Sequence, residues 1–348
     1  MIEPIRWAVA GWGAGGRVFH APMIRSTAEL ELVAVVSTNA ARAEQARAEG
    51  LSVVPDLRSL RDLEVEGVTI TTPAGTHADL AIEALGLGLH VVVDKPFATT
   101  ASDAERIVAA ASPDQVLTVY QNRRWDGDFL TLAGLVGRGE LGRLDRFESR
   151  IERFRPDLPA WTRDRDSAHG GGTLVDLGPH LIDQAVQLMG PVRAVFADLA
   201  VLGPERVADN DVLLLLRHAS GARSTIVASV HAAAEGPRFR LSGERGGARI
   251  VGFDGQEDQL FAGASPQLLG DEWGVEDRTV EVELPSGAQS RPLDRGRWDV
   301  FYAGVAAAVL DRAPVPVDPR DGVRVAEIFD AARRSAAEGA WVEVANAR

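Results

Sequence analysis

Residues 5–16 read IRWAVAGWGAGG, an apolar segment that leads into three glycines with G-x-G-x-x-G spacing. The apolar part is typical of a buried strand. Glycine permits a tight turn at the first position, close approach of the backbone to a pyrophosphate at the second, and close packing of a helix on the strand at the third. A helix after this loop would present free N–H groups to the phosphates. Gly11, Gly13 and Gly16, with the neighbouring Arg17, therefore predict a dinucleotide site, provided that they lie in a βαβ unit.

The first third of the chain has the alternation of strands and helices that this motif requires. Strands are predicted at 5–10, 30–37, 67–72, 90–94 and 116–120, and helices at 40–49, 76–85 and 102–111. The strands are almost wholly apolar, which is expected when helices cover both faces of a parallel sheet. The series predicts an α/β fold for residues 1–122: a Rossmann-type, doubly wound parallel sheet that binds NAD(P).

The pattern changes after about residue 123. Strands are predicted at 143–154, in a hairpin formed by 211–217 and 223–231, and in a second hairpin within 238–252. Helices are predicted near 298–311 and 321–337. Sequential strands joined by short turns indicate a mostly antiparallel sheet. Residues 123–348 are therefore predicted to form an α+β domain with helices on one side of its sheet.

The composition narrows the class of protein. The chain has 348 residues, 45% of them hydrophobic and 25% charged, and a formal net charge of −13. A strongly acidic chain is a poor partner for nucleic acid or for an anionic membrane. The absence of cysteine excludes disulfides, thiolate catalysis and thiolate metal sites. Without a recognisable signal peptide or a long apolar run, the expected location is the cytoplasm.

The end of the second predicted strand bears on the choice of cofactor. An Asp or Glu in this region would bind the ribose 2′-hydroxyl of NAD. Here Ser37, Thr38 and Asn39 occupy the place, and no carboxylate comes before Glu44. Hydroxyls could donate to a 2′-phosphate and Arg42 could pair with it, which favours NADP while NAD stays possible. The three polar residues could also simply cap the next helix.

Several polar turns follow predicted strands, at the edge where parallel sheets bind ligands. They are TTPAGTH (71–77), DKPF (94–97) and YQNRRW (120–125). Lys95 is thereby directed at the rim where a nicotinamide would lie, although an isolated Lys-Pro is ordinarily a surface lysine that ends a strand. Thr72, Pro73, His77 and Lys95 are the residues of these turns that we expect near the cofactor.

A second group of candidate residues lies in HGGGTLVDLGPHLIDQAVQLMG, residues 169–190. Asp176, His180 and Asp183 share one face if this segment is a single helix. A carboxylate one turn from a histidine can fix the orientation and tautomer of the imidazole. The three glycines before the helix would permit a ligand to approach the backbone closely. The alternative is a buried helix with a capping aspartate and a structural histidine.

Together these motifs resemble the Gfo/Idh/MocA oxidoreductases over essentially the whole chain. The resemblance rests on GWGAGG, on DKP where the family usually has Glu-Lys-Pro, and on GGGTLVDLGPHLID. Four further segments resemble the subgroup that contains the NADP-dependent scyllo-inositol dehydrogenases: QNRRWDGDFL (121–130), ERFRP (152–156), GPRFRLSGERG (236–246) and GFDGQED (252–258). The resemblance implies a Rossmann domain followed by a domain with a large, open sheet.

The resemblance also assigns roles to residues. It implies that Lys95, Asp176 and His180 are catalytic and that the peptide bond before Pro96 is cis. The chain departs from the family pattern in three places: Asp94 replaces a glutamate, Asn39 stands where the subgroup has an arginine, and Trp161 is followed by Thr162 and not by arginine.

The predicted activity is reversible hydride transfer between a nicotinamide and a secondary alcohol of a cyclic polyol or sugar. His180 or Lys95 would transfer the proton, and the sequence does not divide these roles. The residues expected at the substrate are Lys95, Asn122, Arg124, Arg155, Asp176 and His180, and Arg123 and Arg153 lie beside them. Each of these four arginines could equally belong to a solvated sheet face or to an interface. No dedicated metal site is predicted. The alternatives are a non-catalytic sugar or dinucleotide sensor and an NAD-dependent glycosidase on the same fold.

The predicted partners are a small polyol or sugar and further copies of the chain. An open antiparallel sheet that carries apolar residues is costly to leave bare. Together with what is usual in the family, this suggests a homodimer or homotetramer built on the sheet of the second domain.

Overall fold

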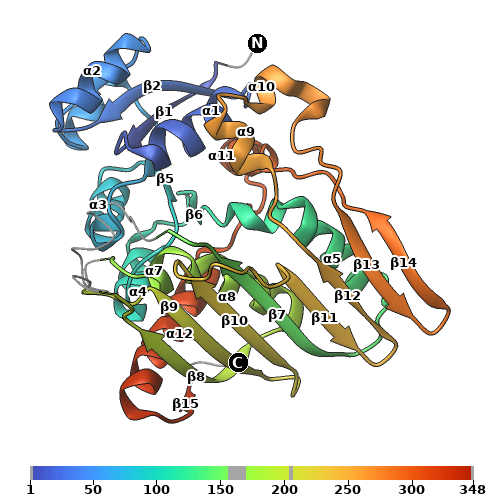
Figure 1. Cartoon of the computed structure of the whole chain (residues 1–348). Coiled ribbons are helices and arrows are strands. Elements are labelled where there is room, and N and C mark those ends of the chain that lie inside the picture. The colour runs from blue at the N-terminus through green and yellow to red at the C-terminus, as the bar shows by residue number, and fades with distance from the viewer. Residues whose placement is uncertain (1–2, 156–169, 204–206, 346–348) are drawn as a thin grey trace.

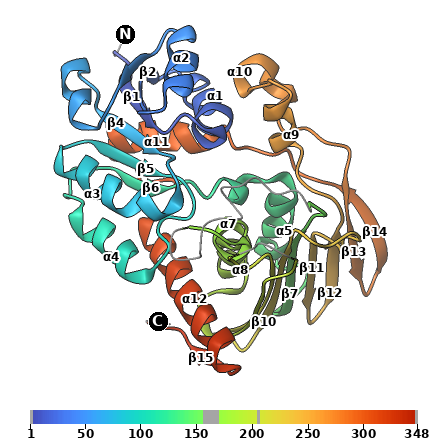
Figure 2. The ribbon, with the colours of Figure 1, turned by 60° about the vertical axis from the view of Figure 1, so that its left-hand side comes forward.

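The computed structural model describes residues 3–155, 170–203 and 207–345 (Figure 1). A six-stranded sheet with its helices forms the upper left of Figure 1, and a nine-stranded sheet forms the lower part. In Figure 2, helices α7 and α8 lie between the two sheets. The described residues contain no helix that is both long enough and apolar enough to cross a bilayer.

The six-stranded sheet is parallel throughout, in the order β3-β2-β1-β4-β5-β6. The order reverses at β1, and open α/β sheets bind ligands at the carboxyl ends of the strands beside such a reversal, here β1 and β4. The predicted Rossmann-type sheet and its five strands are confirmed; β3 was not predicted. The strands are β1 (Ile5–Ala10), β2 (Leu30–Val36), β3 (Ser52–Val54), β4 (Gly67–Ile70), β5 (His90–Val93) and β6 (Leu117–Val119).

Helices cover the parallel sheet as the alternation requires. A π-helical segment, Gly15–His20, follows the glycine loop and continues into a short α-helix. Asn39 and Thr100 cap the helices that start after them, because each side chain accepts a hydrogen bond from a first-turn N–H. The helices are α1 (Ala21–Arg25), α2 (Ala40–Ala48), α3 (His77–Gly86) and α4 (Ala101–Ala110).

The nine-stranded sheet has the order β14-β13-β12-β11-β7-β10-β9-β8-β15. All neighbours are antiparallel except β7 and β10. The two predicted hairpins are present as β9–β10 and β11–β12. The strands are β7 (Leu144–Glu152), β8 (Val192–Ala200), β9 (Asp211–His218), β10 (Arg223–Ser229), β11 (Phe239–Gly243), β12 (Gly246–Ile250), β13 (Thr279–Leu284), β14 (Gly287–Pro292) and β15 (Val342–Glu343).

One face of this sheet is covered by helices. Leu214, Leu216 and Ile226 share a core with Leu181 of α8 and Phe329 of α12. The opposite face is turned toward the viewer in Figure 1. The remaining helices are α5 (Gly127–Gly137), α7 (Thr173–Asp176), α8 (Gly178–Met189), α9 (Gln256–Phe261), α10 (Pro266–Leu269), α11 (Val300–Asp311) and α12 (Pro319–Glu338).

The chain returns to the first sheet after building the second. Trp298, Phe301 and Tyr302 lie in the same core as the strands of the parallel sheet. The Tyr302 hydroxyl is 2.8 Å from Thr69 Oγ1 and 2.7 Å from His20 Nδ1, both buried. A buried polar chain therefore ties α11 to β4 and to the helical segment after the glycine loop.

Candidate active site

The glycine loop has the geometry of a dinucleotide cradle. Gly11 has a φ of +101°, a conformation that favours glycine. A Cβ on Gly16 would lie 2.1 Å from the Gly11 carbonyl oxygen and 2.9 Å from Val9, so only glycine permits this packing. A Cβ on Gly13 would meet nothing closer than the Arg42 guanidinium at 3.7 Å. The loop therefore leaves backbone open to a ligand beside a cation, which fits a pyrophosphate-containing cofactor.

The end of β2 carries polar groups and no carboxylate. Asn39 Oδ1 accepts a hydrogen bond from the backbone N–H of Arg42, and Ser37 Oγ accepts one from Asn39. Helix capping is therefore one role of this segment. The Arg42 guanidinium lies near Gly13 and has no carboxylate partner among the described residues. Thr38 and Arg17 are exposed.

Lys95 and Asp176 come together across 81 positions of the chain. Lys95 Nζ donates to Asp176 Oδ1 at 2.9 Å and to the Asp176 carbonyl oxygen at 2.8 Å. Burial disfavours ionisation of Asp176, but the charge and hydrogen bond of Lys95 and the charge of Arg153 together outweigh it, so the pKa of the carboxyl is lowered. The peptide bond between Lys95 and Pro96 is cis, as the family resemblance implied.

His180 lies close enough to Lys95 for the charge of the lysine to act on the imidazole. It is 5% exposed, and its Nδ1 is buried without a hydrogen-bond partner. Burial, and then the positive charge of Lys95, lowers the pKa of His180 well below its ordinary value, so the imidazole is neutral at pH 7. The structure thus brings the three predicted catalytic residues into one region.

Two details of the predicted helix 169–190 are wrong. The segment forms two helices with a break at Leu177, and Asp176 ends the first while His180 belongs to the second. No hydrogen bond joins Asp176 to His180, because the carboxylate is bound to Lys95. Asp176 thus orients the lysine and not the imidazole.

The glycine run before these helices packs against protein. A Cβ on Gly170 would lie 2.9 Å from the Cβ of Ala74, and one on Gly172 would lie 2.5 Å from Asp209 Oδ1. The prediction that a ligand approaches this backbone is therefore wrong, because the glycines contact the 73–75 turn and Asp209 instead. Asp209 also caps α7, since its carboxylate accepts a hydrogen bond from the Leu174 N–H.

Arg124 and Asp183 form a separate buried cluster. Arg124 binds Asp183 through two hydrogen bonds of 2.7 and 2.5 Å and contacts Asp321 of α12 at 2.8 Å. Two carboxylates thus surround the guanidinium that we expected at the substrate. The arrangement gives Arg124 a role in packing α8 and α12 against the end of β6, and it binds Asp183 away from the candidate catalytic residues.

His77 lies between two strand-end turns and not on the open surface. Its Nδ1 is 2.8 Å from the Pro96 carbonyl oxygen and its Nε2 is 2.7 Å from that of Thr72. The ring is 2% exposed, so the expected cofactor contact becomes a positioning role, in which His77 links the 71–77 turn to the Lys95-Pro96 turn. Thr72 and Pro73 remain accessible on that turn.

The remaining predicted substrate residues differ in their exposure to solvent. Asn122 is buried in the turn after β6, whereas Arg155 is exposed beyond β7. Trp161 and its neighbours lie outside the described residues. Arg123 binds Asp126 and Glu257 at 3.2 and 2.5 Å and is buried, so it does not belong to a solvated face.

Sequence reasoning missed two features of the site. Glu257 and Arg153 lie 3.6 Å apart, and the charges of Lys95 and Arg153 both act on the pKa of Glu257. The second feature is that Lys95 is the only lysine in the chain. The other 36 of the 37 basic Lys and Arg residues are arginines. A protein that uses arginine everywhere else retains lysine where an ammonium is needed, since the two groups differ in hydration, geometry and pKa. That signal was available in the sequence.

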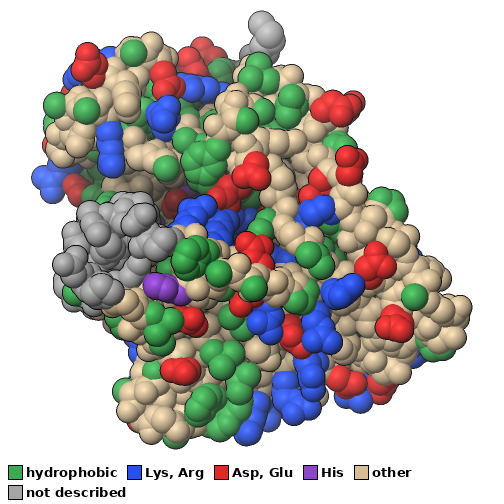
Figure 3. All heavy atoms as spheres, viewed as in Figure 1, with side chains coloured by type: hydrophobic (Ala, Val, Ile, Leu, Met, Phe, Trp, Pro, Cys, Tyr) green, Lys and Arg blue, Asp and Glu red, His purple; other side chains and the backbone are tan. Residues whose placement is uncertain are grey.

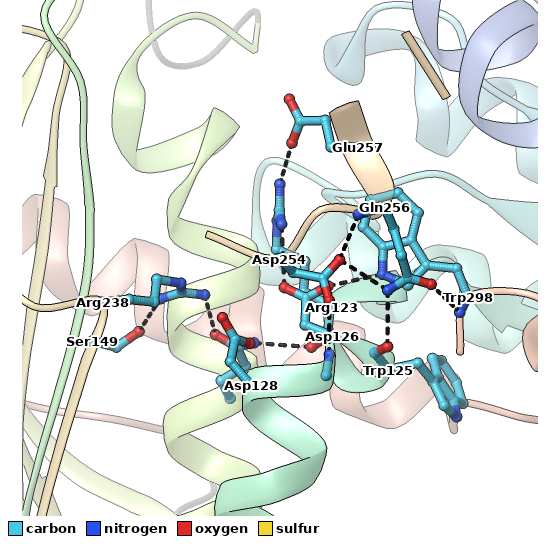
Figure 4. Close-up of polar contacts among 12 residues, drawn as sticks. Arg123, Trp125, Asp126, Asp128, Ser149, Arg238, Asp254, Gln256, Glu257 and Trp298 are labelled. Carbon is cyan, nitrogen blue, oxygen red and sulfur yellow. Dashed lines mark hydrogen bonds and ion pairs between the residues drawn. The ribbon is translucent and has the colours of Figure 1, made fainter. Parts of the chain in front are cut away.

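Figure 4 shows how the residues around Glu257 are held. Asp254 Oδ2 accepts from the Gly127 N–H at 2.8 Å, and Asp254 Oδ1 accepts from Gln256 N at 2.9 Å. Gln256 in turn donates to the Trp125 carbonyl and accepts from the Trp298 N–H. The described residues contain no group of three or more histidines or carboxylates placed to hold a metal.

The reversal of strand order, the glycine loop and the Lys95–Asp176 pair are the features expected of an NAD(P)-binding oxidoreductase. Comparison with known proteins agrees. Residues 5–121 match the family model "Oxidoreductase family, NAD-binding Rossmann fold" and residues 129–249 match "GFO/IDH/MocA C-terminal domain". The chain belongs to the Gfo/Idh/MocA family.

Individual relatives cover nearly the whole chain. The uncharacterized oxidoreductase YdgJ of Escherichia coli K12 is 36% identical over 97% of both chains. The scyllo-inositol 2-dehydrogenase (NADP(+)) IolW of Bacillus subtilis 168 is 30% identical over 97% of this chain and 95% of its own. The solved structure of the putative oxidoreductase yvaA from Bacillus subtilis superposes with a TM-score of 0.90 and 29% identity, covering 99% of each chain.

Proposed function

We propose that the protein is a dehydrogenase that transfers hydride between NADP and a secondary alcohol of a cyclic polyol or sugar, with inositols as the first candidates. The observation that carries this proposal is the ion pair of Lys95 with Asp176 next to a neutral His180. The name of the relative IolW supports inositol and NADP.

The bound nicotinamide supplies the hydride acceptor or donor. In the oxidative direction, the neutral imidazole of His180 takes the hydroxyl proton. Nδ1 is enclosed, so Nε2 is the ring nitrogen that accepts it. The ammonium of Lys95 stabilises the developing alkoxide, and Asp176 holds that ammonium in place through two hydrogen bonds. Catalysis thus requires a charged lysine and an uncharged histidine at once.

A substrate screen tests this function. The protein is incubated with a panel of inositols and sugars and with NADP or NAD, and reduced cofactor is followed by absorbance. Turnover of at least one neutral polyol is the expected result. A sugar sensor would bind ligands without reducing NADP, and a glycosidase would cleave a glycoside without net redox change; either outcome would replace the proposed function.

The choice of NADP rests on Arg42. Its guanidinium lies over Gly13 without a carboxylate partner among the described residues, and the end of β2 offers no acid to repel a 2′-phosphate. We expect Arg42→Gln to raise KM for NADP about tenfold, the loss of one charge-assisted contact, and to leave KM for NAD unchanged. Arg47→Gln, at an exposed position of the same helix, is the matched control. Equal effects of Arg42→Gln on both cofactors would contradict this assignment.

We also propose that two copies of the chain pair through the open face of the nine-stranded sheet. Leu213 and Leu215 of β9 and Val227 of β10 are half-buried on this face, and Phe196 of β8 lies opposite Leu215. Figure 3 shows hydrophobic side chains gathered over this part of the molecule, next to groups of both charges.

Charges flank the apolar strip in a pattern that suits an identical partner. On β7, Glu148, Arg150 and Glu152 alternate in sign along the same face. A twofold axis can set each charge against its opposite, as a self-complementary interface requires. Leu215→Glu should convert the dimer to a monomer by light scattering, whereas Ser290→Glu on the exposed edge strand β14 should not. A monomeric wild-type chain would refute the pairing.

A further inference from the structure

Glu257 is a carboxylate that the fold holds rigidly beside the candidate active site. It follows Gln256, which is fully buried and hydrogen-bonded on both sides, so the first turn of α9 cannot shift freely. Figure 4 shows Glu257 extending from this anchored loop toward Arg123. The loop at 252–258 lies outside both segments that match the family models, although its sequence, GFDGQED, resembles the inositol dehydrogenase subgroup.

The charges around Glu257 are shared with the candidate catalytic residues. Glu257 Oε2 is 2.5 Å from Arg123 Nη2 and 3.6 Å from Arg153 Nη2. Arg153 also acts electrostatically on Asp176 and His180. Burial disfavours the ionised form of Glu257, but the charges of Arg123, Arg153 and Lys95 outweigh it and hold the pKa below its ordinary value. Glu257 is therefore an anion within reach of the site's cations.

The three cations that act on Glu257 each have a carboxylate partner. Lys95 is paired with Asp176, Arg123 with Asp126 and Glu257, and Arg153 with Glu257. A fourth cation, Arg238, also acts on His180, but it is 2% exposed and bound to the neutral Ser149 and Gln184 side chains, so a ligand cannot reach it.

We propose that Glu257 is a specificity-determining residue that favours uncharged polyols, because it neutralises Arg153 and so withdraws this cation from an anionic substrate. This inference rests on the proposed polyol dehydrogenase function. Both side chains are partly exposed, at 19% for Glu257 and 22% for Arg153, so their remaining acceptor and donor groups are open to hydroxyls of a neutral ring. A substrate carboxylate would instead have to displace Glu257 from Arg153 and would be repelled by it.

The test compares two ligands that differ only at C6, which is a hydroxymethyl group in D-glucose and a carboxylate in D-glucuronate. Inhibition constants of D-glucose and D-glucuronate are measured against the neutral polyol that the enzyme turns over best. In Glu257→Gln, Arg153 loses its partner, so we expect the preference for glucuronate over glucose to rise about tenfold relative to wild type. The double variant Glu257→Gln/Arg153→Gln should lose that gain. Glu140→Gln, which removes a surface carboxylate paired with Arg138 and Arg291, is the matched control and should change nothing.

The outcomes are distinguishable. An unchanged ratio in a folded, active Glu257→Gln enzyme overturns the specificity role and leaves the proposed function standing. A wild-type protein that reduces NADP with no polyol overturns both. If Glu257→Gln does not fold, as judged by its Tm, Arg153→Gln gives the reciprocal test: its site is one unit more negative, so glucuronate should inhibit about threefold more weakly relative to glucose than in wild type. No change in that ratio also overturns the proposal.

Discussion

Replacing Lys95 by methionine is expected to reduce kcat about a thousandfold, since it removes the ammonium that would stabilise the alkoxide while nearly preserving side-chain length. The same change should leave the dissociation constant of NADP within about threefold of the wild-type value, because the phosphates would be bound by the glycine loop and by Arg42. Steady-state turnover of the best polyol and quenching of protein fluorescence by NADPH measure the two quantities.

Lys95→Arg is the matched variant, since it keeps the positive charge. A guanidinium is larger and planar, so its donors would not occupy the position from which Nζ reaches both the carboxylate and the carbonyl oxygen of Asp176. We therefore expect Lys95→Arg to be impaired as well. A Lys95→Met enzyme with more than about a tenth of wild-type kcat would show that the alkoxide is stabilised elsewhere.

The second large effect is expected at the glycine loop. Gly16→Val should weaken NADP binding by about a hundredfold or more, because its Cβ would overlap the Gly11 carbonyl oxygen and push the loop out of register with the phosphates. Fluorescence titration with NADPH gives the affinity, and thermal unfolding shows whether the sheet tolerates the change.

Variants of two other glycines distinguish a loss of cofactor binding from a loss of stability. A Cβ at Gly13 would overlap no protein atom, so Gly13→Ala should keep the wild-type Tm and still weaken NADP binding where the backbone would face the pyrophosphate. Gly86→Ala, in open space at the end of α3, should alter neither property. Wild-type affinity in both Gly16→Val and Gly13→Ala would remove the dinucleotide site from this loop.

The sequence predicted the parallel half of the fold well because its signals are local. Each strand of the first sheet is a short apolar run, and each glycine of the loop has a separate steric task that its spacing reveals. β13 was missed although TVEVEL alternates polar and apolar residues, whereas β14, GAQSRP, has no apolar alternation that would mark it as a strand. Their pairing depends on neighbours far away in the chain, which periodicity does not report.

The sequence predicted which residues belong to the candidate site better than it predicted their contacts. Lys95, Asp176 and His180 were found by motif, yet the break at Leu177 and the binding of Asp176 to Lys95 were not, because they depend on how two distant segments meet. Arg124 shows the same limit. An arginine at a strand end is equally compatible with substrate and with a carboxylate on α8, and only the packing of α8 decides between them.

The division predicted at residue 122 follows the end of β6, but the core does not divide there. Tyr302 of α11 bonds to Thr69 and His20 inside the first half, so the parallel sheet completes its interior with a side chain that is synthesised much later. We keep the two-domain division as a proposal about ligand binding and not about independent folding.

Because Lys95 is the single lysine of the chain, the candidate active site is also open to spectroscopy. With one ε-amine in the whole polypeptide, protein grown on isotope-enriched lysine yields a single side-chain NMR resonance, free of overlap. That resonance belongs to the group that would meet the reacting oxygen, so its chemical shift reports protonation, cofactor occupancy and ligand arrival directly, without mutation or assignment.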